Sequence, residues 1–410
     1  MHALRRFSKN LLAGTLAALA VAGTTDARTS VLYHFAGGGD GANPAASLIQ
    51  DSKGNFYGTT YAGGGTGCGG GGCGTVFKFS ADGTENVLYA FQGGSDGRNP
   101  WCTLVEDEDG TLYGTTIYGG NNDLGTVFKL VPDGTETVLH SFAGRKDGNS
   151  PQRGLIRDKK GNLYGTTLLG GSAGCTAGFG CGTVFRLAPN GNETVLYAFT
   201  GGRDGAYPYA SVVLDQVGNL YGTTSQGGSN GCDHSGCGVV FKLGPQRLLT
   251  VLHTFAGGND GASPIASLRR DKAGNLYGTT SGGGPYDLGI VFKLQPDGTE
   301  TVLHTFAGGS DGAYPEANLI QDRVGNLYGT TVGANSANNC PPDCGTVFKL
   351  APDGTETVLY AFRNHTRHGR TPYAGLIKAG SGELYGSASL GGDPHCGQKY
   401  GCGTVYMLRK

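Results

Sequence analysis

The sequence has little charge, one tryptophan and no long segment with helical periodicity. Charged residues make up 15% of its 410 residues, and 31 basic side chains nearly balance 32 acidic ones. This balance provides no basic surface, so we expect neither nucleic acid nor a membrane surface as a partner. The absence of a Ser/His/Asp set and of a nucleophile elbow argues against the common serine hydrolases. With 78 glycines, the composition indicates an all-β protein rich in turns.

What the sequence does have is internal repetition. A stretch close to "GNLYGTT" occurs seven times, at spacings of 56, 51, 57, 56, 51 and 57 residues. Its tyrosines are Tyr57, Tyr113, Tyr164, Tyr221, Tyr277, Tyr328 and Tyr385. A phosphate-binding loop is needed once per nucleotide, so a glycine pattern used seven times is scaffold.

Each repeat reads as four strands. "ASLIQD" alternates and ends in a D-x-x-G-N turn, whose aspartate can accept backbone hydrogen bonds. "NLYGTT" follows, then a glycine-rich loop, "GTVFKL", a "PDGT" turn and "TVLHSF". The glycine after the tyrosine marks close approach by a neighbouring surface. Two hairpins in series predict a four-stranded antiparallel sheet.

Seven such sheets predict a seven-bladed β-propeller with four-stranded antiparallel blades. The chain supports closure of the ring, because residues 31–35 read as a fourth strand without the first three. The last residues, "GTVYMLRK", read as a third strand without a fourth. We therefore expect the N-terminal strand to close the last blade, and residues 28–410 to form one domain. An open solenoid is the rival fold, but it needs caps at both ends.

Residues 1–27 have the features of a signal peptide. Arg5, Arg6 and Lys9 precede the apolar run "LLAGTLAALAVAG", and Ala27 ends a small-residue cleavage site. The alternative of a membrane anchor is weaker, because the run is short for a membrane span. We expect a monomer without a membrane span in the mature chain, secreted or periplasmic, with the cell surface as a further location.

Ten of the eleven cysteines form close pairs. These are Cys68 with Cys73, Cys175 with Cys181, Cys232 with Cys237, Cys340 with Cys344, and Cys396 with Cys402. Every pair lies between the second and third strands, and the two repeats without a pair are those with the 51-residue spacing. This pattern predicts disulfide-clipped loops, each stabilising by only about 2 kcal/mol. Zinc is the alternative, but zinc sites usually have shorter cysteine spacings, so we expect no metal and no cofactor. Cys102 takes a position held elsewhere by alanine and is expected to be a buried thiol.

The candidate binding site follows from the strand order. Interblade connections and second-to-third-strand loops share one face, where binding usually occurs. Aspartates of the "GGxDG" segment there could bind calcium or a sugar or, as we favour, cap their own turns. Residues beside the proline of the same segment should crowd the mouth of the central channel. Those that we select as ligand-binding candidates are Trp101, Tyr207, Tyr209, Tyr314, Glu316 and Tyr373. The alternative is that these rings fill the seams between blades.

The combined motif "GNLYGTT…GTVFKL.PDGTETVLH.FAGG.DGA.P" resembles the GloVer-type (Gloeo/Verruco) tandem repeat of exported bacterial proteins. The resemblance covers nearly all of residues 31–408. It implies a secreted or surface location and a repeat scaffold, and it brings no catalytic residues. Anchored members carry a C-terminal tail that this sequence does not show, which leaves attachment to the cell surface open.

These observations together favour a binding module for a glycan or a surface protein over an enzyme. A propeller hydrolase or lyase is the alternative, since such enzymes gather carboxylates, histidines or a metal around the axis. The inner strands offer mainly small residues instead, and Glu316 and Arg153 are the only charges at their start. A purely structural surface protein is the third hypothesis.

Overall fold

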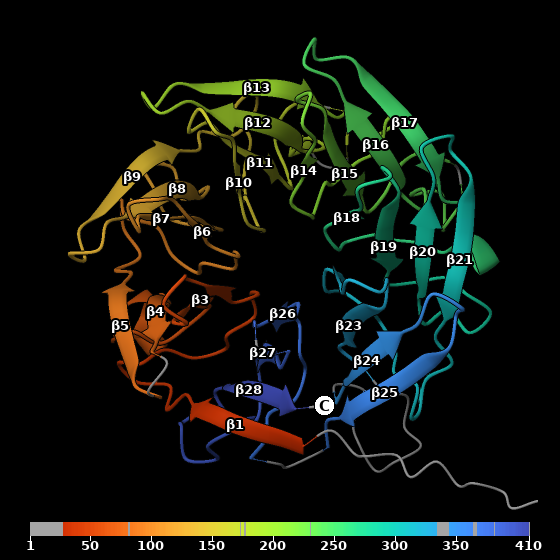
Figure 1. Ribbon diagram of the computed structural model, residues 1–410. Coiled ribbons are helices and arrows are strands. Elements are labelled where there is room, and N and C mark those ends of the chain that lie inside the picture. Colours follow the sequence, from red (N-terminus) through yellow and green to blue (C-terminus); the bar gives the residue numbers. More distant parts are fainter. Residues whose placement is uncertain are drawn as a thin grey trace, which may run out of the picture.

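The structure of the protein is a computed structural model. It describes residues 28–80, 83–172, 174–175, 178–229, 231–333, 344–363, 367–380 and 382–409. The predicted signal peptide and Cys340 lie outside the described residues. Seven four-stranded antiparallel sheets surround a common axis (Figure 1). The predicted all-β seven-bladed propeller is confirmed.

All blades share one strand order, from a short strand near the axis to a longer strand at the rim (Figure 1). The first strands are β2 (Ile49–Gln50), β6 (Val105–Glu106), β10 (Ile156–Arg157), β14 (Val213–Leu214), β18 (Arg269–Arg270), β22 (Ile320–Gln321) and β26 (Ile377–Lys378). The second strands are β3 (Phe56–Thr60), β7 (Leu112–Thr116), β11 (Leu163–Thr167), β15 (Leu220–Thr224), β19 (Leu276–Thr280), β23 (Leu327–Thr331) and β27 (Leu384–Ala388). The third strands are β4 (Thr75–Phe79), β8 (Thr126–Leu130), β12 (Thr183–Leu187), β16 (Val239–Leu243), β20 (Ile290–Leu294), β24 (Thr346–Leu350) and β28 (Thr404–Arg409). The fourth strands are β5 (Glu85–Ala90), β9 (Glu136–Ser141), β13 (Glu193–Ala198), β17 (Leu249–Thr254), β21 (Glu300–Thr305), β25 (Glu356–Ala361) and β1 (Arg28–His34).

The ring closes in the seventh blade. There β1 pairs antiparallel with β28, so that Val31 lies opposite Tyr406 and His34 opposite Thr404. Figure 1 shows β1, in red, beside β28, in blue. The N-terminal strand therefore closes the last blade, as the sequence predicts.

Aromatic pairs hold the blades to one another. In every seam, the aromatic residue after a fourth strand meets the aromatic residue on the third strand of the next blade. The pairs are Phe35–Phe77, Phe91–Phe128, Phe142–Phe185, Phe199–Phe241, Phe255–Phe292, Phe306–Phe348 and Phe362–Tyr406. Their ring centroids lie 5.2 or 5.3 Å apart at 63–71°, the edge-to-face geometry that aromatic rings favour. All fourteen side chains are buried.

The glycine after the repeated tyrosine makes room for these rings. Gly165 on β11 lies directly opposite Phe185 on β12. A Cβ atom at position 165 would lie 2.7 Å from Cζ of Phe185 and 2.8 Å from Cδ2 of Leu155. A close approach is present as predicted, but the approaching groups belong to the same blade and not to a neighbouring one.

The D-x-x-G-N turns form as predicted. Oδ1 of Asp322 accepts the backbone N–H groups of Val324, at 3.1 Å, and Asn326, at 3.0 Å. Its Oδ2 accepts the Tyr328 hydroxyl at 3.0 Å. Burial acts to raise the pKa of Asp322, but these hydrogen bonds together with the Asn326 side chain lower it to about 2. The repeated tyrosine thus ties the second strand to the preceding turn.

The "GGxDG" aspartates cap interblade turns, which confirms the turn interpretation. Asp147 accepts the N–H of Ala143 at 2.6 Å and lies 3.1 Å from Nε2 of His140. The other five aspartates accept the equivalent N–H: Asp40, Asp96, Asp204, Asp260 and Asp311. In each of these blades a tyrosine or histidine of the fourth strand is a second partner.

A glutamate at the start of the next fourth strand lies near most of these aspartates. Burial, with a smaller contribution from the nearby Asp96 carboxylate, raises the pKa of Glu136 to about 7. The same pKa of about 7 applies to four further glutamates, which are Glu85, Glu193, Glu300 and Glu356. Five seams therefore contain a carboxyl group that stays protonated until the pH approaches 7.

We expect Gly165→Ala to destabilise the protein by about 1–3 kcal/mol, because the new methyl group overlaps a ring that cannot move without opening a seam. Chemical denaturation followed by circular dichroism measures this change. Gly39→Ala is the matched control, since a Cβ there meets no atom within 4 Å. Equal stability of the two variants would contradict the packing role of the glycine.

We expect thermal stability to fall as the pH rises from 5 to 8. The five seam glutamates have a raised pKa of about 7 in the folded chain, so they hold protons there that the unfolded chain has already released. Their favourable contribution is complete below the unfolded pKa, near 4.5, and is lost as the pH passes through 7. Calorimetry at pH 5, 6.5 and 8 tests this, and replacing all five by glutamine should flatten the profile. A melting temperature that rises over this range would contradict it.

Candidate functional site

One face of the ring carries both the interblade connections and the loops between second and third strands. In each blade a residue of the interblade connection forms a bridge with a residue of that loop. The bridges are Ala42–Ala62, Arg98–Tyr118, Asn149–Leu169, Ala206–Gln226, Ala262–Gly282, Ala313–Gly333 and Arg370–Leu390. We call this the loop face, and its composition agrees with the sequence analysis.

Disulfides clip the loops as predicted wherever the chain is described. They join Cys68–Cys73, Cys175–Cys181, Cys232–Cys237 and Cys396–Cys402, with Cα atoms 5.2–6.0 Å apart. The pairing of Cys344 with Cys340 cannot be followed because Cys340 lies outside the described residues. Cys102 is a buried free thiol, also as predicted. Burial raises its pKa to about 11, and its Sγ accepts the N–H of Thr115 at 3.2 Å.

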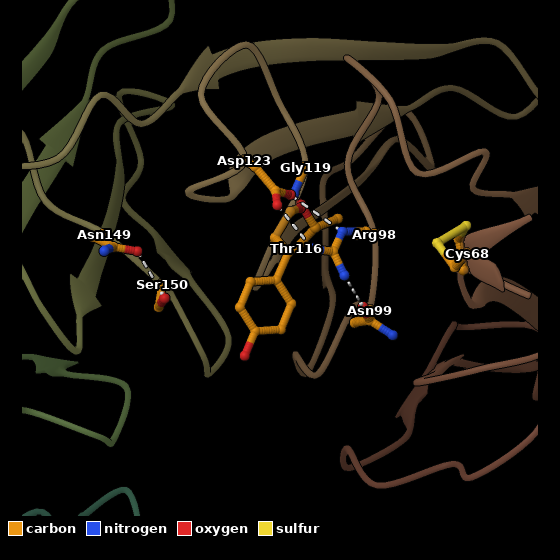
Figure 2. A network of polar contacts seen from close by, with 10 residues as sticks. Cys68, Arg98, Asn99, Thr116, Gly119, Asp123, Asn149 and Ser150 are labelled. Carbon is orange, nitrogen blue, oxygen red and sulfur yellow. Dashed lines mark hydrogen bonds and ion pairs between the residues drawn. A yellow bond between two sulfur atoms is a disulfide. The ribbon is translucent and has the colours of Figure 1, made fainter. Parts of the chain in front are cut away.

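The two loops without cysteine are held by an aspartate instead. Asp123 Oδ1 accepts the N–H of Gly119 at 2.7 Å, and Asp287 does the same for Gly283. Arg98 adds an ion pair to Asp123 at 2.8 Å and stacks on the Tyr118 ring, 4.7 Å from its centroid. Figure 2 shows Arg98 beside Asp123 and Gly119. The sequence analysis missed this clip, although both loops share the letters "DLG".

Trp101 is at the centre of an aromatic cluster on the loop face. Its ring centroid lies 5.8 Å from those of Tyr61 and Tyr373, in edge-to-face geometry. Its indole N–H donates to the Ala45 carbonyl at 3.3 Å. The cluster therefore joins residues that precede the first strands of the first, second and seventh blades to the loop after β3.

Arg153 connects this cluster to the fourth blade. Its guanidinium carbon lies 5.7 Å from the Trp101 ring centroid and 5.2 Å from that of Tyr209. Its Nε and Nη2 atoms are buried and have no hydrogen-bond partner in the described part of the chain. Burial lowers the pKa of Arg153. Two buried N–H groups without a hydrogen-bond partner are unusual in a guanidinium, because taking a polar group out of water without a new hydrogen bond is costly.

Arg153 and Glu316 line a small cavity on the axis. The cavity has a volume of about 20 Å³, enough for about one water molecule. Its other lining residues are uncharged. No ion pair within 4.0 Å joins Arg153 to Glu316. Burial raises the pKa of Glu316, and the positive charge of Arg153 acts in the opposite direction. We call Tyr61, Trp101, Arg153, Tyr209, Glu316 and Tyr373 the channel-mouth group.

Below this group the inner strands close the axis with small polar side chains. Ser47 Oγ donates to Oδ1 of Asn318 at 3.1 Å and accepts the N–H of Gly375 at 2.8 Å. On another side, Ser211 Oγ donates to the Gly154 carbonyl at 2.7 Å. The Ser47–Gly375 and Ser211–Gly154 bonds link neighbouring blades, and the Ser47–Asn318 bond joins the first blade to the sixth. These contacts leave little space on the axis.

The structure gathers four of the six candidates chosen from sequence: Trp101, Tyr209, Glu316 and Tyr373. Tyr207 instead packs against the core cluster between the third and fourth blades, and its N–H donates to the Cys181 carbonyl at 2.8 Å. Tyr314 is 38% exposed, and its N–H donates to the Leu288 carbonyl. No contact of either ring with the channel-mouth group is seen. Tyr61 was missed, since its loop position carries unrelated residues in other repeats.

Exposed aromatic side chains also favour this face. Of the eight exposed large hydrophobic residues among those described, five are aromatic and all five lie on the loop face. They are Tyr118, Phe179, Tyr286, Tyr314 and Tyr400. The three aliphatic ones, Val217, Leu248 and Val324, lie on turns of the opposite face.

The described part of the chain has neither a candidate metal site nor a candidate membrane-spanning helix. No group of three or more His, Cys, Asp or Glu side chains there is arranged to hold a metal ion. Nor does any helix in that part have the length and apolar character needed to cross a membrane.

Sequence comparison supports the resemblance suggested by the motif. Residues 230–410 match the family model of the Gloeobacter/Verrucomicrobia repeat. The blades before residue 230 show the same strand order and the same tyrosine–glycine motif. No curated protein has a sequence that matches this chain.

Solved structures with the same fold are distant in sequence. The extracellular domain of a protein named as a one-component system, from B. thetaiotaomicron, is 11% identical with a TM-score of 0.55; the match covers 93% of this chain and 40% of that one. A Bacteroides uniformis protein named as a 6-phosphogluconolactonase is 17% identical with a TM-score of 0.50, over 84% of this chain and 89% of that one. At these identities the likeness concerns the fold alone.

We expect reduction of the disulfides to loosen four loops while the blades persist, because each bond closes a loop of only five or six residues. Hydrogen exchange read by mass spectrometry with and without reductant measures this loop by loop. The loops around Asp123 and Asp287 are internal controls and should not change. Exchange that increases throughout the strands would contradict the role as local clips.

Proposed function

We propose that this protein is an exported binding module that recognises a glycan through its loop face, with the channel-mouth group as the primary site. The observation that carries the proposal is the cluster around Trp101, the one tryptophan of the chain. Tyr61 and Tyr373 contact its ring, and Arg153 lies between it and Tyr209 beside Glu316.

Aromatic faces beside a few polar groups are suited to sugars. The C–H groups of a pyranose ring pack on an aromatic face, while its hydroxyl groups need donors and acceptors at the edge. Arg153 supplies N–H donors and Glu316 supplies a carboxyl group that can accept or, when protonated, donate. The exposed rings of the loop face provide further contacts for a long polymer.

Export is part of the proposal. Disulfides persist in oxidising compartments, and four of them are present in the described chain. Residues 1–27 carry the pattern of a cleaved signal peptide, which would leave residues 28–410 as one secreted or periplasmic domain. A glycan of the cell envelope or of the surroundings is then within reach.

A hydrolase or lyase is the second candidate. The observation that favours it is Glu316, a largely buried carboxyl group with a raised pKa, as a general acid requires. Its neighbours offer no second carboxylate on the axial cavity, and such a pair is the usual requirement for glycoside hydrolysis. Release of reducing ends or of unsaturated products during incubation with polysaccharides would favour this candidate over simple binding.

We expect Trp101→Ala to weaken glycan binding by at least about tenfold, ~1.4 kcal/mol, because a central aromatic ring usually dominates such a site. Isothermal titration calorimetry with neutral and acidic oligosaccharides of three to six units measures this effect. Tyr286→Ala, in an exposed loop of the fifth blade, is the control for general loss of aromatic surface. The proposal fails if the unmodified protein binds none of these saccharides, or if Trp101→Ala binds them equally well.

A further inference from the structure

Arg153 breaks the repeat at a position where the repeat tolerates little variation. The equivalent residues of the other six blades are small and at most 5% exposed: Ala46, Cys102, Ala210, Ala266, Ala317 and Ala374. A long cationic side chain at this slot cannot fit into the same space. It is directed instead toward the axis, where it lines the cavity with Glu316 and stacks on Trp101 and Tyr209.

The following glycine accommodates this departure. A Cβ atom at Gly154 would overlap the Thr103 carbonyl oxygen of the second blade. The backbone at this point is therefore pressed against the neighbouring inner strand, and the Arg153 side chain is held beside the residues before β6. The guanidinium position is thus set by backbone packing as well as by the two rings.

The charge of Arg153 is offset only in part, because Glu316 lines the same cavity but forms no ion pair with it. Among the described residues, Nε and Nη2 are buried without a hydrogen-bond partner, and no carboxylate there forms an ion pair with Arg153. Stacking on Trp101 and Tyr209 compensates only in part, since cation–π contacts contribute less than paired hydrogen bonds to a carboxylate. These unpaired N–H groups could therefore bind an anion from a ligand.

We propose that the channel mouth binds an acidic sugar residue of the glycan, with the sugar carboxylate on Arg153 and the sugar ring against Trp101. This inference rests on the proposed function and names its ligand class. A uronic acid or a sialic acid has the required combination of a carboxylate and an apolar ring face.

Size and shape favour a carboxylate as the group that reaches Arg153, because one carboxylate oxygen is about as large as the water molecule that the cavity can hold. The axial cavity holds about one water molecule, so a whole sugar ring stays outside, in contact with the aromatic cluster. A carboxylate is planar and matches two N–H groups of a guanidinium, which forms a pair of parallel hydrogen bonds. A sulfate ester carries the same charge in a bulkier, tetrahedral group, so sulfated sugars form a separate arm of the test.

Glu316 opposes this anion. It is the only carboxyl group on the cavity, and its charge repels a bound carboxylate across the axis. Removing that charge while keeping the size of the side chain should therefore strengthen the binding of acidic sugars. Loss of Arg153 should have the opposite effect and weaken the binding of acidic sugars. A purely structural role of Arg153 and Glu316 predicts neither change in affinity.

The decisive experiment compares matched acidic and neutral sugars by calorimetry. The acidic ligands are sialyllactose, the trimer of galacturonate and the trimer of glucuronate. The neutral ligands are lactose and the two trimers with their carboxyl groups reduced. A sulfated trisaccharide is the additional arm. Arg153→Ala is the main variant, because alanine is the residue at five of the six equivalent positions, including Ala210 and Ala266. Its melting temperature should not fall.

We expect the unmodified protein to bind at least one acidic ligand about tenfold or more tightly than its neutral counterpart. Arg153→Ala should lose this preference while it still binds the neutral sugar, and Glu316→Gln should increase it by roughly threefold. Equal affinity for acidic and neutral partners, or a preference that survives in Arg153→Ala, overturns the inference and leaves glycan binding intact. A preference for the sulfated arm alone also overturns it. If no sugar binds at all, the proposed function falls as well.

Discussion

The fold depends on one contact that is repeated in every seam, a buried aromatic ring edge-on to the ring of the next blade. Each ring needs space, and the glycine opposite it on the second strand provides that space. A blade alone would expose this ring and could not bury the other face of its sheet, so stability requires the complete circle. The pairing of β1 with β28 supplies the last blade, and the pair Phe362–Tyr406 shows the same geometry with tyrosine in place of phenylalanine.

Because the frame is repeated, its repeated polar groups are explained by structure. The turn aspartates accept backbone N–H groups, the second-strand tyrosines reach back to them, and the seam histidines contact capping aspartates. The disulfides and the hydrogen bond of Asp123 both fix the loop between the second and third strands. Function is therefore to be sought where one blade differs from the others. Trp101, Arg153 and Glu316 are such departures, and they meet at the axis.

Much of this architecture could be predicted from the sequence. The seven copies of the repeat predicted seven blades, and the partial repeats at the two ends predicted the closure of the ring. The cysteine pairs occur only in the longer repeats, which predicted the disulfides. These features follow from local patterns that recur, so each copy supports the others. The aspartate turns were predictable for the same reason.

The site was predictable only in part, because it is assembled from residues that do not recur. Repeat alignment places Trp101, Tyr209, Glu316 and Tyr373 beside the axis, but it cannot tell which rings touch. Tyr207 and Tyr314, one position before the proline, adopt φ values of 58° and 57°, a conformation that non-glycine residues rarely adopt and that no sequence pattern indicated. Arg153 was visible as a charge among small residues, yet its stacking on two rings depends on side chains from separate blades.

One measurement tests the central claim that ligands bind at the channel mouth. Trp101 is the only tryptophan in the chain, so intrinsic tryptophan fluorescence reports on this site alone. Titration with the oligosaccharide that calorimetry identifies as a ligand should change the emission in a saturable way, with the same dissociation constant. Binding detected by calorimetry with no change in tryptophan emission would place the ligand elsewhere and contradict the account.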